Sequence, residues 1–208
     1  MTTLLAGGVA LAVYLCTLAP TVTGEDSGEL VTAAYHLGIP HPHGYPLWCL
    51  LAHPFTWLDV GEVAWRVNLS SAVFAAVAVA LVAVLILMLT RNRLAALGGA
   101  LAFAFSRELW EQAVIAEVYA LNALCIALCV LLLWRWHALR CAQGVPPGCV
   151  APGFLPNPSW RPDGCATRND GDGLLYAFAL LYGLSLGNHY TMVLLGPLFA
   201  VFVLAVDR

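Results

Sequence analysis

The segment Gly24-Glu25-Asp26-Ser27-Gly28-Glu29-Leu30 places three carboxylates within five positions of a chain that otherwise carries little charge. A local explanation exists, because Asp26 suits the N-cap of a helix and Glu29, three residues later, would complete a capping box. A chemical explanation is that one of these carboxylates acts as a general base toward an acceptor hydroxyl. The segment alone leaves both explanations open.

Histidines close behind this segment favour the chemical explanation. The run His41-Pro42-His43-Gly44-Tyr45-Pro46 lies within twenty residues of Asp26, and its prolines restrict the backbone so that the histidines are directed to one place. We expect Asp26 to be the catalytic residue, with substrate contacts from its neighbours Glu29, His41, His43 and Tyr45. The alternative is a divalent metal bound by the same carboxylates and histidines, which ranks second because the ligand spacing is not tight.

A second polar cluster runs from Arg107 to Glu117 and continues to Asn122. Glu117 stands at the outer end of an apolar stretch, where a carboxylate is costly unless it is paired. It could bind substrate, or it could form an ion pair with Arg107 or Arg66 that holds helices together. Asn122 could contact substrate or, equally well, hydrogen-bond between helices.

The third cluster is Asn188-His189-Tyr190, at a turn between two apolar stretches. A histidine in a turn is usually solvated and inert, so His189 gains weight only if its turn lies near the other clusters. The cationic partners available for an anionic group such as a lipid phosphate would then be Arg66, Arg107, His41, His43 and His189.

The composition indicates which solvent surrounds these clusters. The chain has 208 residues, of which 61% are hydrophobic and 10% are charged, whereas a soluble domain carries about a quarter charged residues. Lipid, rather than water, therefore surrounds most of the chain. The net charge of −3, without a basic run, excludes a nucleic-acid partner.

Uncharged stretches predict an all-α, polytopic transmembrane helix bundle with about six spans, since a bilayer core of about 30 Å needs about 20 apolar residues. The predicted spans are Thr2–Thr23, Val67–Thr90, Leu94–Ser106, Val118–Trp134 and Leu174–Val206, the last divided in two by Gly187-Asn188-His189-Tyr190. Apolar residues at helical spacing predict short amphipathic helices at the membrane surface, one near Leu30–Leu37 and another near Pro46–Leu58.

The arginines predict how the chain is oriented. They dominate alternate loops, which places both termini and the Arg91 loop in the cytoplasm and the acidic loops outside. The segment 143–173 is rich in Gly, Pro and Asp and reads as a flexible cytoplasmic connector within a single transmembrane domain. This topology brings all three polar clusters to the outer face.

Several motifs together resemble the transmembrane protein 260 family and its bacterial relatives. They are Gly24 with Asp26-Ser27-Gly28-Glu29-Leu30, His41-Pro42-His43-Gly44-Tyr45-Pro46-Leu47, Arg66-Val67-Asn68, Glu117-Val118-Tyr119-Ala120-Leu121-Asn122 and Gly187-Asn188-His189. The family usually has proline where this chain has His43. Its members are longer, so the chain corresponds to the N-terminal portion of a larger architecture.

The resemblance implies the fold of the multi-spanning type C glycosyltransferases. Such enzymes take a sugar, mannose for the vertebrate member, from a polyprenyl-phosphate donor on the outer or lumenal face. The acidic residue of their first loop acts as the base, a role that falls to Asp26. The implied partners are membrane lipids, this lipid-linked donor and a protein or glycan acceptor, in a bacterial cytoplasmic membrane or, in a eukaryote, the endoplasmic reticulum membrane.

Two other classes of protein remain as alternatives. A small transporter or channel subunit could use the acidic loop as a vestibule, and a non-catalytic assembly subunit would need no chemistry at all. A transporter places its ionisable groups near the membrane midplane. Here those groups gather at one face, which favours the enzyme.

Overall fold

The structure, a computed structural model, describes residues 1–42, 44–144 and 168–206. The described residues form helices and turns without a strand, which confirms the expected all-α fold class. His43 and most of the expected 143–173 connector lie outside them. The described helices reach into both ends of that connector: α7 (Tyr119–Gly144) ends within it and α8 (Arg168–Leu186) begins within it. Once nucleated in apolar sequence, a helix extends at little cost per added residue.

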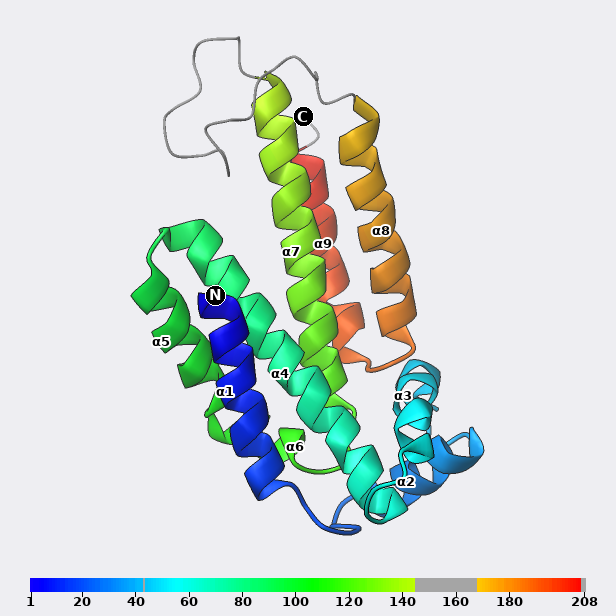
Figure 1. The fold of residues 1–208 in the computed structure, drawn as a ribbon. Coiled ribbons are helices and arrows are strands. Elements are labelled where there is room, and N and C mark those ends of the chain that lie inside the picture. The colour runs from blue at the N-terminus through cyan, green and yellow to red at the C-terminus, as the bar shows by residue number, and fades with distance from the viewer. Residues whose placement is uncertain (43, 145–167, 207–208) are drawn as a thin grey trace.

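Long helices run up and down the molecule in alternating directions (Figure 1). Helix α4 is central and packs against α1, α5 and α7, while α7 also packs against α8. Besides α7 and α8, these helices are α1 (Thr2–Thr17), α4 (Val63–Thr90), α5 (Arg93–Ala104) and α9 (Thr191–Val206).

Small residues allow α1 to approach α4 closely, as is common where helices pack in a lipid environment. A Cβ atom on Gly7 would lie only 3.0 Å from the Cβ atom of Ala80 and 3.1 Å from the carbonyl oxygen of Ala76. Tyr14, seven residues after Gly7 in α1, is fully buried, and its hydroxyl donates a hydrogen bond to the carbonyl oxygen of Ala104 at 2.7 Å. Helix α1 is therefore fixed against both α4 and the end of α5.

Among the described residues, two helices are long and apolar enough to cross a membrane, rather than the expected six. They are Val63–Thr90, with 28 residues, and Tyr119–Arg140, with 22 residues. The other expected spans are present as apolar helices of 10–17 residues, namely Thr2–Thr17, Arg93–Ala104, Asp172–Leu186 and Thr191–Val206. The first is shorter than expected because it ends ahead of Pro20, and the residues before a proline disfavour helix.

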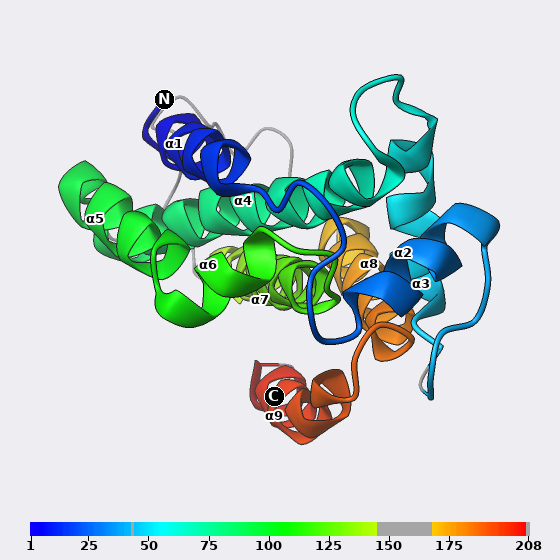
Figure 2. The ribbon, with the colours of Figure 1, turned by 90° about the horizontal axis from the view of Figure 1, so that it is seen from below.

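Among the described helices, four are short. The short helices gather at one end of the bundle, at the bottom of Figure 1. The two short helices expected after the first long helix are confirmed, as α2 (Ser27–His36) and as α3 (Pro46–Ala52) continued by the 3₁₀ helix η1 (His53–Trp57). The fourth, α6 (Arg107–Ala113), lies where the sequence predicted only a loop. Seen from this end, the connection between α1 and α2 crosses near the start of α7, and the turn between α8 and α9 lies close by (Figure 2).

Candidate functional site

The capping-box explanation of the first acidic segment is wrong. Asp26 does occupy the N-cap of α2, but its side chain makes no cap hydrogen bond. Glu29 turns toward the next loop instead, where its Oε1 accepts the backbone N–H of His41 at 2.7 Å and its Oε2 lies 3.0 Å from His41 Nδ1. Because 58% of the Asp26 side chain remains exposed, its carboxylate is accessible to a substrate.

The imidazole of His41 joins two carboxylates and a phenol. Its Nδ1 faces Glu29, while its Nε2 lies 3.6 Å from Asp26 Oδ2 and 3.3 Å from the hydroxyl of Tyr45. The Tyr45 ring packs edge-on against the imidazole and is buried. These four residues, Asp26, Glu29, His41 and Tyr45, form what we call the first-loop cluster.

The first-loop cluster can do two kinds of chemistry. Asp26, steadied by a histidine that a second carboxylate holds in place, has the arrangement of an oriented general base. Alternatively, one ligand atom each from Asp26, Glu29 and His41 lie within 4.8 Å of one another, so these groups could hold a divalent cation. Carboxylate oxygen and imidazole nitrogen suit several such ions. His43, the fourth expected ligand, lies outside the described residues.

Glu117 is fixed by its own backbone between α6 and α7. Its carbonyl oxygen accepts hydrogen bonds from Trp48 Nε1 at 3.0 Å and from Ser71 Oγ at 3.3 Å, and its N–H donates back to Ser71 Oγ. In the part of the chain that the structure describes, Glu117 forms neither of the two possible ion pairs, with Arg66 or with Arg107. Arg107 binds Glu111, and the guanidinium of Arg66 donates to three backbone carbonyl oxygens.

The carboxyl group of Glu117 lies in a buried, acidic place. Burial raises its pKa from 4.5 to about 7. Hydrogen bonds from the backbone amides of Val118 and Asp26 oppose this shift, and the charges of Glu25 and Asp26 add to it. The pKa of Glu117 therefore depends on how close the α1–α2 connection lies to the start of α7.

Replacing Glu117 with glutamine should change how stability depends on pH. Between about pH 5 and about pH 7 the folded wild type binds more protons than its unfolded chain, so its stability falls as the pH rises, by on the order of 3 kcal/mol in all. Glutamine does not titrate and lacks this loss. Thermal unfolding in detergent across this range measures the difference, with Glu62→Gln as the exposed control. Parallel pH profiles for wild type and Glu117→Gln would contradict the assignment.

The α8–α9 turn closes the other side of the same region. Asn188 is buried and its Nδ2 donates to the carbonyl oxygen of Val118 at 3.3 Å, directly after Glu117. The ring of His189 lies 5.0 Å from that of Tyr119. Within the turn's surroundings, Asn122 Nδ2 donates to Thr191 Oγ1 at 2.9 Å.

Tyr45 shows that all three segments meet. Its pKa is raised by burial first and then by the charges of Tyr119, Asp26, Glu117 and Tyr190. Of these four residues, all but Asp26 come from the other two segments. The structure thus brings Asp26, Glu29, His41, Tyr45, Glu117, Asn122, Asn188 and His189 to one end of the bundle. Arg66 instead holds the loop before α4 through its hydrogen bonds to backbone carbonyl oxygens. Arg107 is paired with Glu111 on the surface, with 83% of its side chain exposed.

Sequence reasoning did not reveal the role of several residues that hold these loops in place. Asn68, fully buried in α4, donates through Nδ2 to the carbonyl oxygens of Ala19 and Thr21 and so fixes the chain ahead of Asp26. Trp48 and Ser71 do the same for Glu117. The available signal was a set of polar residues, Asn68, Ser70 and Ser71, directly before the uncharged apolar run that makes up the rest of the helix.

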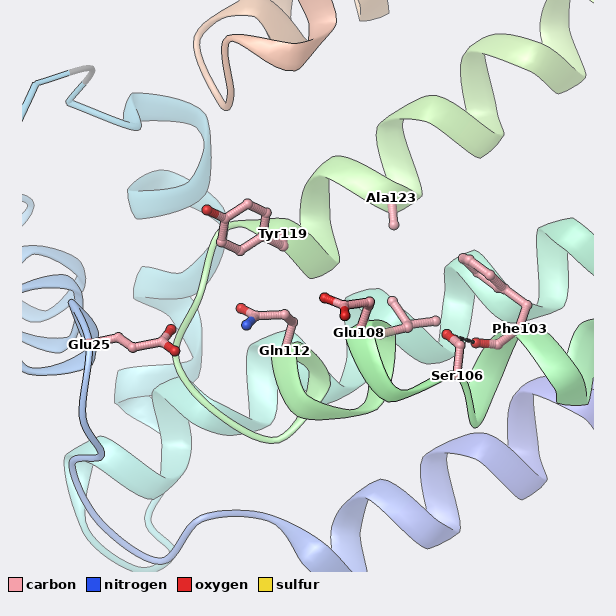
Figure 3. A pocket seen from close by; sticks show the side chains of 8 residues that line it. Glu25, Phe103, Ser106, Glu108, Gln112, Tyr119 and Ala123 are labelled. Atoms are coloured by element: carbon pink, nitrogen blue, oxygen red, sulfur yellow. Dashed lines mark hydrogen bonds between the residues drawn. The ribbon is translucent and has the colours of Figure 1, made fainter.

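Sequence reasoning also missed a cavity of about 640 Å³ that is lined in part by Glu25, the residue before Asp26. It lies between the α1–α2 connection, the end of α5, α6 and the start of α7 (Figure 3). Its lining includes Glu25, Phe103, Glu108, Leu109, Gln112 and Tyr119. Glu108 and Gln112 stand four residues apart on α6, which places them on one helical face.

Comparison with known proteins agrees with the motifs. A family described as "Protein O-mannosyl-transferase TMEM260 N-terminal domain" matches residues 26–208. The chain is 41% identical over 133 residues, 64% of its length, to a mouse protein named "Protein O-mannosyl-transferase TMEM260". It is 29% identical over 128 residues, 60% of its length, to the protein of the same name in Dictyostelium discoideum.

These matches cover 19% of the mouse protein and 16% of the Dictyostelium protein, so the chain spans less than a fifth of the length of these curated relatives. No solved structure matches the chain. The family match nevertheless extends from Asp26 through every helix that contributes to the site. The chain therefore belongs to the family of the TMEM260 N-terminal domain.

Proposed function

We propose that the protein is a membrane glycosyltransferase that moves a sugar, mannose by analogy with its relatives' name, from a polyprenyl-phosphate donor to an acceptor hydroxyl. The acceptor would be a protein or a glycan on the non-cytoplasmic face. The single observation that carries the proposal is Asp26, an accessible carboxylate that His41 contacts at the place where three loops meet.

In this reaction Asp26 accepts the proton of the acceptor hydroxyl. The oxygen of that hydroxyl attacks the anomeric carbon of the sugar at the same time. The new carbon–oxygen bond forms on the face opposite the phosphate. The old bond breaks, and its electron pair leaves with the polyprenyl phosphate. Glu29 keeps His41 in position, and His41 in turn orients Asp26, which its Nε2 contacts. A cation bound at Asp26 would exclude this role, because a coordinated carboxylate is a poor base.

The surrounding residues fit the two ends of the donor. Asn122 and Asn188 each have a buried side-chain oxygen without a hydrogen-bond partner among the described residues. Each oxygen can therefore accept a hydrogen bond from a hydroxyl group of the sugar donor or of the acceptor substrate. Arg107 can exchange its exposed pairing with Glu111 for the departing phosphate, because surface ion pairs are weak. His189 is a second candidate near that phosphate, whereas the donors of Arg66 are already used.

We also propose the expected topology of about six spans, with both termini in the cytoplasm. The alternating directions of the long helices support it, because the acidic connections fall at one end and the Arg91 turn falls at the other (Figure 1). The apolar helices shorter than a membrane is thick would then need neighbouring apolar residues or local thinning of the bilayer to complete the crossing.

The donor class tests this function. The purified protein in lipid nanodiscs should transfer radiolabelled mannose from polyprenyl-phosphate mannose to a serine- and threonine-containing peptide. It should transfer none from GDP-mannose, since a soluble nucleotide sugar is not the proposed donor. Transfer from GDP-mannose alone would contradict the donor class, and movement of intact donor across the bilayer without a mannosylated product would favour the transporter.

A further inference from the structure

The cavity beside the first-loop cluster has an unusual lining. Carboxylates of Glu25 and Glu108 and the amide of Gln112 point into the same space from two different segments (Figure 3). Among the described residues, its lining includes neither an arginine nor a histidine. Two carboxylates without a cation repel a phosphate, so this cavity is unsuited to the charged part of the proposed donor.

One of the lining residues has an acceptor atom that lacks a partner. Gln112 Oε1 is buried without a hydrogen-bond partner among the described residues, and a buried acceptor left in this state is costly. The two carboxylates and this amide give the lining three acceptor groups, which suit a ligand with several hydroxyl donors. The ligand chemistry that follows is a neutral polyol.

Part of the cavity lining is apolar and aromatic. Phe103, Leu109 and Ala123 contribute apolar side chains, and Tyr119 contributes an aromatic ring. Phe103 and Ala123 lie on the other side of Gln112 from Glu25 (Figure 3). A pyranose ring combines hydroxyl edges with C–H faces, and such faces pack on apolar and aromatic side chains. The volume of about 640 Å³ lies in the usual range for small-molecule sites, about 300–1,000 Å³.

The cavity also lies where the reaction would need a sugar. Glu25 lines it and directly precedes Asp26 in the chain. The charges of Glu25 and Asp26 both act on Glu117, so the two carboxylates border one region. A hexose in the cavity would therefore have one end close to the first-loop cluster.

We propose that this cavity is the hexose subsite, in which Glu108 and Gln112 accept hydroxyl hydrogens of the sugar and determine which sugar is bound. The assignment rests on the proposed function for its place in the reaction. It makes a separate claim about binding, however, and that claim can be tested without turnover.

The test uses methyl α-mannoside, a neutral sugar without phosphate or lipid, and saturation-transfer NMR on the purified protein in detergent. The wild type should show saturation transfer to the sugar, and Glu108→Ala and Gln112→Ala should each weaken binding by roughly tenfold. Glu111→Gln, on the same helix but outside the lining, serves as the control and should bind like the wild type. Mannose 1-phosphate should bind more weakly than methyl α-mannoside.

Unchanged binding in both lining variants, with elution profiles and helical signals like the wild type, would overturn the assignment. Equal weakening in Glu111→Gln, absent binding by the wild type, or a preference for mannose 1-phosphate would overturn it as well. Asp26→Asn should keep the saturation signal while losing transfer. Sugar binding by a protein that transfers no sugar supports the subsite and refutes the enzymatic function, so the two failures are distinguishable.

Discussion

Replacing Asp26 with asparagine is expected to lower the rate of sugar transfer by about 10²–10⁴-fold, the usual contribution of a general base. Asparagine has nearly the same size and can still lie beside His41, but it cannot accept the hydroxyl proton. Because the Asp26 side chain is 58% exposed and makes no cap hydrogen bond, folding should hardly change. Transfer of labelled mannose from the lipid donor under saturating conditions measures the effect.

A matched control separates this effect from a general loss of negative charge. Asp59→Asn makes the same change at an exposed position in the loop before α4, outside the first-loop cluster. It should transfer at nearly the wild-type rate. Equal losses in both variants would mean that net charge, rather than Asp26 itself, supports transfer.

Trp48→Ala is expected to have the largest effect on stability, about 3–5 kcal/mol, as for other buried tryptophans. The side chain is fully buried in α3, and its Nε1 donates to the carbonyl oxygen of Glu117. Its loss leaves a void and removes the contact that ties α3 to the start of α7. We therefore expect transfer to fall together with the unfolding temperature in detergent.

Two further variants test the origin of that loss. Trp48→Phe keeps most of the packing, and the Glu117 carbonyl oxygen still accepts from Ser71, so it should cost only about 1–2 kcal/mol. Trp57→Ala removes the same side chain where it is 73% exposed, which should change stability by no more than about 0.5 kcal/mol. A Trp48→Ala protein as stable as Trp57→Ala would contradict the anchoring role.

The helices could be predicted because the signal for each is local. Uncharged apolar stretches identified the long helices, and apolar residues at helical spacing identified α2 and the helix that starts at Pro46. Their lengths were less predictable, since apolar composition continues through Leu18 and Ala19 after α1 has ended at Thr17. Helix α6 was missed because its seven residues bury only Leu109 and Ala113, too little apolar periodicity to separate it from a loop.

The candidate site was also predictable only in part. The neighbours of Asp26 in the sequence became its neighbours in space, as the contacts of His41 with Asp26 and Glu29 show. The capping box failed because a helix-start pattern cannot reveal that the carboxylate of Glu29 has a partner twelve residues further on. Glu29 occupies the position that a capping box requires, but its carboxylate binds His41 instead.

Contacts between distant segments could not be predicted from spacing. Trp48 meets Glu117 across 69 positions, and Ser71 meets it across 46. The cavity likewise combines Glu25 with Glu108 and Gln112, which only the packing of α6 beside the α1–α2 connection brings together. Such residues look like ordinary loop or helix residues until the fold is known.

The most direct test of the central claim follows one bound donor through one reaction. Radiolabelled polyprenyl-phosphate mannose is bound to the purified wild type and to Asp26→Asn in detergent, and an acceptor peptide is then added. We predict that both proteins retain the donor, that the wild type passes its label to the peptide, and that the label stays on the lipid in Asp26→Asn. Transfer at similar rates by both proteins, or failure of the wild type to bind the donor, would contradict the account.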